Sequence, residues 1–210
     1  MPTLVALTLL LAAAPARADA WVLDPSTGSF RVVIMKEGAL RALGHDHVLE
    51  VRDFRGSVEL QDSSATLHLQ INTAGLDIDD AAARRAEGLA GEVSDADRAK
   101  IRRTMRGEKG LDVRRYPLIT LDARSIEPVE SEKDMWMLSG EFSLHGTTST
   151  LDLPVTLVPR PGGYWAYGYA RLRPSDYGIE PVKALGGLVR TADEALVRFN
   201  LALIHDGVRP

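Results

Sequence analysis

Two histidines separated by a single residue are the side chains of this sequence best suited to chemistry. His45 and His47 lie in the stretch RALGHDHVLEV, residues 41–51, directly before residues typical of a β-strand. Residues i and i+2 of a strand point to the same face, so we expect both imidazoles to face one point in space. Imidazoles bind metal ions, and near neutral pH they also donate and accept hydrogen bonds.

Three interpretations of this pair are open from the sequence. A metal site needs a third ligand, and His145 in the predicted hairpin SLHGTT, His68 and His205 are the candidates. In the second interpretation, His45, His47 and His145 contact the polar headgroup of a ligand. In the third, the histidine pair only forms hydrogen bonds where a strand begins. The chain contains no cysteine, which excludes thiolate ligands, thiol nucleophiles and disulfides.

Other function classes lack their sequence signatures. The chain has no Gly-x-Ser-x-Gly elbow, no P-loop and no dinucleotide-binding glycine pattern, so we do not expect an enzyme. Its formal net charge of −4 is the wrong sign for binding a phosphate backbone, and we expect no nucleic-acid partner. The basic run AKIRRTMRGEKGLDVRR, residues 99–115, is interpreted as the solvated face of a helix and the loop that follows it, and a phosphate- or membrane-binding role is the alternative.

The first twenty residues have the pattern of a secretory signal peptide. An apolar run, LVALTLLLAAAP, is followed by ARADA, which offers small-x-small cleavage sites after Ala18 and Ala20. The run is too short to span a bilayer comfortably, and no later segment approaches that length. We therefore predict a signal peptide over residues 1–20 and one domain over residues 21–210. The mature protein is expected in the periplasm or secreted, without stable insertion in a membrane.

Most of the mature chain alternates apolar and polar residues, as half-buried strands do. Residues 65–72 are the clearest case, with Leu67, Leu69 and Ile71 on one face. Further strands are predicted over residues 28–36, 47–54, 56–61, 117–126, 134–146, 150–158, 164–172 and 195–204.

One segment, residues 93–110, predicts a helix instead. Ser94 is a suitable N-cap, and Ile101 and Met105 lie on one face four residues apart. An antiparallel all-β chain with one interrupting helical segment is typical of a sandwich or a closed barrel, and the number of strands favours a barrel of about eight. Such an interior either fills with side chains or holds one small ligand, and the pattern leaves both possible.

Four blocks of sequence, in order, resemble the YceI-like family of exported polyisoprenoid-binding proteins. They are WVLDPSTGSFRVVIMKEG with LGHDHVLEVRDFRGSVEL, then LDVRRYPLITLDARSI, LSGEFSLHGTTSTLDLPVTL and LRPSDYGI. The resemblance extends from Trp21 to Ile204. It implies an extended eight-stranded antiparallel lipocalin-like barrel with one inserted α-helical segment, whose apolar cavity holds an isoprenoid-type lipid without catalysis.

The alternation of the strands gives the residues expected to line such a cavity. They are Phe30, Val32, Leu67, Leu69, Ile71, Ile119, Leu121, Leu153 and Val155. The predicted function is therefore to sequester and transport a lipid or quinone-like amphiphile. The alternative is a periplasmic metal-binding accessory protein that uses His45 and His47. Ligand identity, chain length and oligomeric state, a homodimer included, are open from the sequence.

Overall fold

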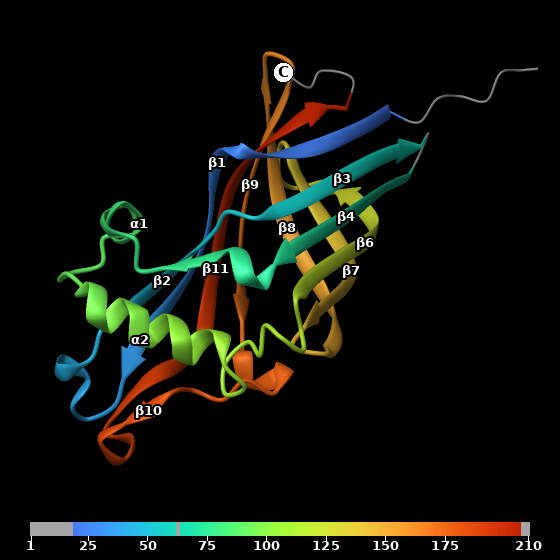
Figure 1. Ribbon diagram of the computed structural model, residues 1–210. Helices are drawn as coiled ribbons and strands as arrows, with labels where there is room; N and C mark the ends of the chain where they lie inside the picture. The colour runs from blue at the N-terminus through green and yellow to red at the C-terminus, as the bar shows by residue number, and fades with distance from the viewer. Residues whose placement is uncertain (1–18, 62–63, 207–210) are drawn as a thin grey trace, which may run out of the picture.

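Eight antiparallel strands close into a barrel in the computed structural model, which describes residues 19–61 and 64–206 (Figure 1). Each strand pairs with the next around the ring, and pairing of the last strand with the first completes it. The strands are β1 (Asp19–Glu37), β3 (Phe54–Gln61), β4 (Ser64–Asn72), β6 (Leu118–Pro128), β7 (Met135–Leu144), β8 (Thr147–Arg160), β9 (Gly163–Leu172) and β11 (Val189–His205). The predicted all-β, eight-stranded barrel is confirmed.

Two further strands lengthen the wall on one side. β2 (His47–Val51) and β3 follow each other along β1, with Val48 opposite Val33 and Val58 opposite Trp21. β5 (Leu76–Ile78) continues β4 in the same way and pairs with β2. The prediction of one strand over residues 47–54 was wrong at its end, because the ladder breaks after Val51 and Phe54 already belongs to β3.

Helix α2 (Asp95–Arg106) lies beside β5, where the sheet has no further strand. The hydroxyl of Ser94 accepts a hydrogen bond from the backbone N–H of Asp97 at 3.1 Å, and the helix ends before Gly107. The predicted helix over residues 93–110 is therefore shorter at both ends. A second, short helix, α1 (Ala81–Ala86), precedes it and is capped by the carboxylate of Asp80.

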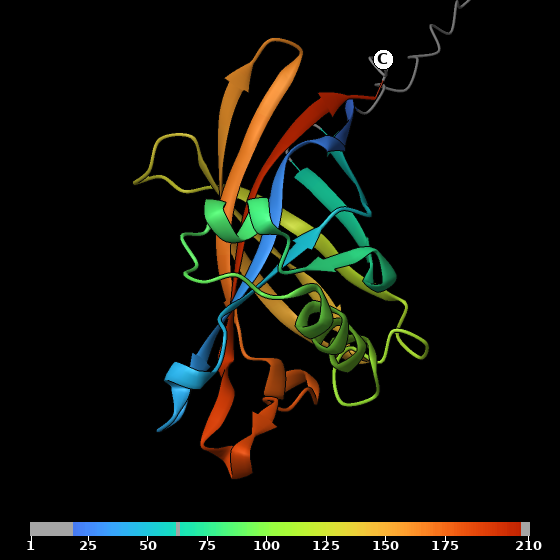
Figure 2. The ribbon, with the colours of Figure 1, turned by 60° about the vertical axis from the view of Figure 1, so that its left-hand side comes forward.

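The two ends of the barrel differ. We call the end with the β8–β9 turn and the first residues of β1 the hairpin end. The opposite end, called the helix end, carries α2, the 3-10 turn η1 (Arg41–Leu43), the short strand β10 (Lys183–Ala184) and the turn η4 (Leu185–Gly187), as Figure 2 shows. Strand β1 runs from the hairpin end to the helix end, where Glu37 lies opposite Arg190 of β11.

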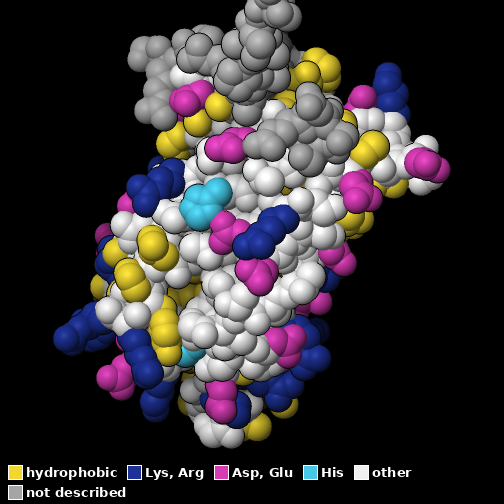
Figure 3. Space-filling view, turned by 90° about the vertical axis from the view of Figure 1, so that its right-hand side faces the viewer, with side chains coloured by type: hydrophobic (Ala, Val, Ile, Leu, Met, Phe, Trp, Pro, Cys, Tyr) yellow, Lys and Arg dark blue, Asp and Glu magenta, His cyan; other side chains and the backbone are white. Residues whose placement is uncertain are grey.

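The outer wall is polar where it faces solvent. On the face shown in Figure 3, acidic and basic side chains are interspersed and hydrophobic side chains gather toward the edges. None of the helices within residues 19–61 and 64–206 is both long and apolar enough to cross a membrane. The predicted signal peptide lies almost wholly outside the described residues and stays a prediction.

Candidate binding cavity

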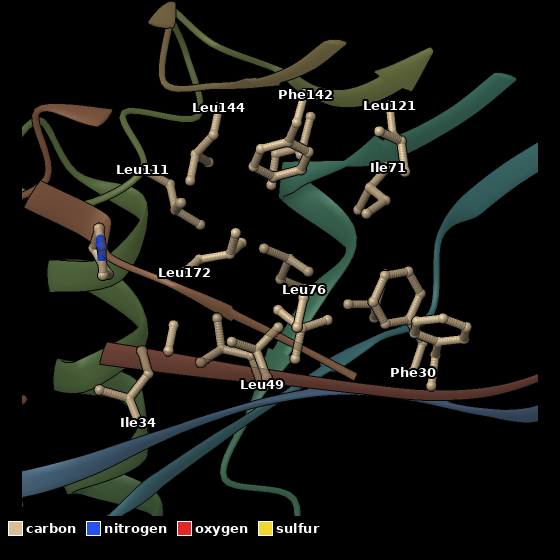
Figure 4. Close-up of a pocket in the computed structure, with 18 of the residues that line it drawn as sticks. Phe30, Ile34, Leu49, Ile71, Leu76, Leu111, Leu121, Phe142, Leu144 and Leu172 are labelled. Carbon is tan, nitrogen blue, oxygen red and sulfur yellow. The ribbon is translucent and has the colours of Figure 1, made fainter. Parts of the chain in front are cut away.

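An elongated apolar cavity of about 1010 Å³ occupies the interior of the barrel. All eight barrel strands contribute to its wall, as do β2, β5 and α2. Figure 4 shows apolar side chains from opposite walls, among them Phe30, Leu121 and Leu172, converging on this space. Ligand pockets usually measure roughly 300–1,000 Å³, so this cavity is large enough for a long-chain molecule.

The nine residues that alternation pointed to all line this cavity. Sequence reasoning missed a second group, contributed by the segments that lie beside the barrel: Leu49, Leu76, Ile101, Met105 and Leu111. The i, i+4 spacing of Ile101 and Met105 marked an apolar face on α2, but nothing in the sequence showed which surface that face covers. They pack beside β5, on the cluster that contains Leu49 and Leu76.

The polar side chains that line the cavity are distributed unequally. At the helix end they include Lys36, His45, His47, Lys100, Thr104, Lys109, Glu180, Arg190 and Thr191. The middle of the cavity is lined by apolar residues such as Leu67, Phe142 and Leu153. At the hairpin end, the polar lining is reduced to Asp134 and the aromatic rings of Trp21, Trp136 and Tyr164.

A buried cluster of charged groups holds His47 in place at the helix end. The Nδ1 of His47 lies 2.7 Å from Oδ2 of Asp79, a residue that is 3% exposed. The other carboxylate oxygen, Oδ1, accepts hydrogen bonds from the backbone N–H of Val48 at 3.1 Å and from Arg84 Nη1 at 2.8 Å. Burial would raise the pKa of the Asp79 carboxyl, but these donors outweigh it, and its pKa lies below the usual value of 3.8.

Arg84 is itself buried, and each of its three side-chain nitrogens donates to a backbone carbonyl. Nη1 also donates to the oxygen of Asp46 at 2.6 Å, Nη2 donates to Ala90 at 2.9 Å and Nε donates to Gly91 at 3.2 Å. The guanidinium therefore ties β2, the residues before it and the loop after α1 into one unit. A buried charge pair persists only when its hydrogen bonds are completed in this way.

This cluster sets what His47 presents to the cavity. An ionised carboxylate can only accept, so the Nδ1 of His47 carries a proton and donates the hydrogen bond to Asp79. The tautomer is thereby fixed, and Nε2 is the ring nitrogen left to bond a ligand. His45, two residues earlier, is exposed and also lines the cavity, but it lies before β2 begins, so the strand geometry behind the i, i+2 prediction does not apply to it.

His145 does not join this pair. It lies in the β7–β8 turn, where its Nδ1 is 3.1 Å from the carbonyl oxygen of Tyr177 and its ring is 4.6 Å from that of Tyr116. His145 lines a separate polar pocket instead of the cavity. His68 pairs with Asp122 on the outer wall, and His205 packs against Trp21. Within the described residues, no group of three or more His, Asp or Glu side chains is placed to hold a metal ion.

Comparisons with known proteins agree with this architecture. A family model described as the YceI-like domain matches residues 21–203. The crystal structure of Burkholderia cenocepacia BcnA is similar, with a TM-score of 0.63 and 15% identity over 86% of this chain and 98% of that chain. A YCEI protein of Campylobacter jejuni that crystallises with large solvent channels gives a TM-score of 0.51 and 10% identity, over 73% and 82% of the two chains. The curated proteins give no significant match.

The Asp79 cluster makes a prediction about stability and pH. Asp79→Asn is expected to lower the free energy of unfolding at pH 7 by about 3–5 kcal/mol, because Arg84 keeps a buried charge without its counterion. Since the folded pKa of Asp79 lies below 3.8, the wild-type protein keeps this contribution above that pH and loses it as the pH falls through the folded value. The difference in free energy of unfolding between the wild type and Asp79→Asn should therefore become smaller in acid. Urea unfolding between pH 7 and pH 3 would measure this difference.

Asp122→Asn is the matched control, because it breaks a His–Asp pair on the exposed wall. Pairs in water contribute about 0–1 kcal/mol, so the control should unfold almost as the wild type does. Equal losses in the two variants would contradict the special role of the buried cluster.

Proposed function

This chain belongs to the YceI-like family, and on that premise we propose that it is an exported protein that binds an isoprenoid-type lipid and carries it between sites. The observation that supports this most is the shape and polarity of the cavity. Its length is lined by apolar side chains, and most of its polar side chains lie at one end. An amphiphile with a long hydrocarbon chain and a small polar head has the same distribution of polarity.

The chain of the ligand would supply most of the binding free energy. Burying a methylene contributes about 0.8 kcal/mol, so a prenyl chain binds tightly in an apolar cavity without any hydrogen bond. Part of that gain is lost in ordering the chain and in forming the complex. The proposed role is sequestration and transfer, and it needs no catalytic group.

The head of the ligand would lie at the helix end, beside His45 and His47. An unprotonated Nε2 of His47 would accept a hydrogen bond from a hydroxyl head, and a protonated Nε2 would donate one to a quinone-like oxygen. Metal binding by the same two histidines is the weaker candidate, because within the described residues no group of three or more His, Asp or Glu side chains is placed to hold a metal ion. In both cases the structural role of His47 in the Asp79 cluster remains.

Mass spectrometry of the mature protein tests the central proposal. The protein would be purified from the exported fraction without detergent or a histidine tag and measured under native and denaturing conditions. We expect an added mass of several hundred daltons that denaturation removes, on a chain that begins after Ala18 or Ala20. An excess of a single metal ion would favour the alternative, and a full-length chain with no added mass would contradict both the lipid and the export.

Filling the cavity should abolish lipid binding. Ala170 of β9 lines the cavity, whereas its neighbour Tyr169 is 56% exposed on the outer wall. A delipidated wild-type protein is expected to gain thermal stability when a long prenyl lipid is added, by mass action on the folded state. Ala170→Trp should lose most of this gain and Tyr169→Trp should keep it, as thermal denaturation with and without lipid would show. A stabilisation that both variants keep would place the lipid outside the barrel.

The position of the head can be tested with two lipids of equal chain length, a prenyl alcohol and a prenyl hydrocarbon without a head. His47→Gln should weaken the binding of the alcohol about tenfold, the cost of one hydrogen bond, and leave that of the hydrocarbon unchanged. Trp21→Phe, at the hairpin end, should not change the ratio of the two affinities. If only Trp21→Phe changes this ratio, the head lies at the hairpin end.

A further inference from the structure

Two loops at the helix end extend beyond the rest of the barrel and beyond α2. One joins β1 to β2 and contains η1, and the other contains β10 and η4; both project in the same direction in Figures 1 and 2. The backbone N–H of Leu40 donates to the carbonyl oxygen of Leu188 at 2.9 Å, which joins them. We call residues 38–46 and 180–188 together the loop tip.

The loop tip carries an unusual share of exposed apolar side chains. Five of the eleven large hydrophobic residues that are exposed in the described chain lie in it: Leu40, Leu43, Val182, Leu185 and Leu188. Single exposed leucines are ordinary on a soluble protein, but a group at one extremity marks an interaction site. Leu185 is 58% exposed and has a φ of 48°, a left-handed conformation that favours glycine or asparagine. An apolar side chain is thus kept there against the preference of the backbone.

The apolar surface of the loop tip is continuous with the cavity. Leu43, Val182 and Ala184 are exposed at the tip and also line the cavity. A hydrocarbon chain that left the barrel at this end would pass over these side chains. The loop tip is therefore the rim of an opening of the cavity, besides being an exposed patch.

Positive charge is concentrated at the same end. Residues 95–115, which form α2 and the loop after it, contain eight Lys or Arg and four Asp or Glu, on a chain whose net charge is −4. Lys100 and Lys109 of this segment lie at the cavity itself. Basic side chains near inserted leucines are the combination that binds an anionic membrane surface.

From this arrangement we infer that the loop tip docks on the surface of an anionic lipid bilayer, with its leucines in the interfacial region and the opening of the cavity against the membrane. The inference rests on the proposed function for what passes through the opening. A second copy of the chain fits the tip less well, because stable interfaces between proteins bury on the order of 1,000 Å² or more and these leucines lie on two projecting loops.

Flotation with vesicles tests the docking directly. The mature protein would be mixed with vesicles of phosphatidylethanolamine and phosphatidylglycerol, and with vesicles of phosphatidylcholine alone. The wild type should float with the anionic vesicles and much less with the neutral ones. The double variant Leu185→Asn and Leu188→Ser should bind the anionic vesicles at least tenfold more weakly, while its asparagine still suits the left-handed backbone.

The control is the double variant Leu118→Ser and Val158→Ser, which removes two exposed apolar side chains of the barrel wall. It should float as the wild type does. Equal flotation of the tip variant and the control, or no flotation of the wild type, would overturn the docking. If the wild type binds neutral and anionic vesicles equally, the basic residues 95–115 do not contribute to the docking. A wild-type dimer in solution that only the tip variant dissociates would show that the tip binds a second copy instead.

Prenyl-lipid binding in solution, measured on the same samples, separates the two proposals. Binding of the lipid by a wild type that does not float would refute the docking and leave the proposed function in place. Flotation by a protein that binds no prenyl lipid would refute the proposed function and support the docking alone.

Discussion

The pairing of β1 with β11 is the interaction on which the rest of the structure depends. It joins the first strand to the last along nearly their whole length, from Trp21 opposite His205 to Glu37 opposite Arg190. Closure gives each of the eight barrel strands a partner on both sides and leaves only the short strands β5 and β10 at edges, so every barrel strand can turn one face inward. The interior is then lined from all sides by alternate residues, and small side chains such as Ala166 and Ala170 on β9 leave it hollow.

The helix end is built differently from the rest of the barrel, and this difference gives the cavity its polarity. On the side of β4 the wall continues beyond Asn72 through β5, which pairs with β2, and α2 takes the place of a further strand. Helix side chains bring Lys100 and Thr104 to the cavity, while the Asp79–Arg84 pair fixes the start of β2 and with it His47. The cavity is therefore polar at the helix end because α2 and the Asp79–Arg84 pair bring polar side chains to its wall there.

The pattern of the strands predicted much of this, and its failures have physical causes. Alternation identified the inward residues of β1, β4, β6 and β8, because a residue on a strand has only two faces to choose from. The role of Asp79 could not be predicted, since its partner His47 is 32 residues away and the carboxylate is positioned by a left-handed turn. The place of His145 in the hairpin SLHGTT made it a candidate partner of His47, but in the structure it has a φ of 51° in that turn, and its Nδ1 lies 3.1 Å from the carbonyl oxygen of Tyr177. The loop tip could not be predicted, because its two segments have neither the alternation of a strand nor the spacing of a helix.

Closure between the two ends of the chain also has a consequence for the order of events in folding. β1 cannot complete its pairing until β11, more than 150 residues later, is available. Contacts of such long range are slow to form, and until they form, the inner faces of all the strands are open to water and to other chains. The cavity is enclosed only once this pairing has formed, so the proposed ligand would enter after folding, through an opening that remains in the finished barrel.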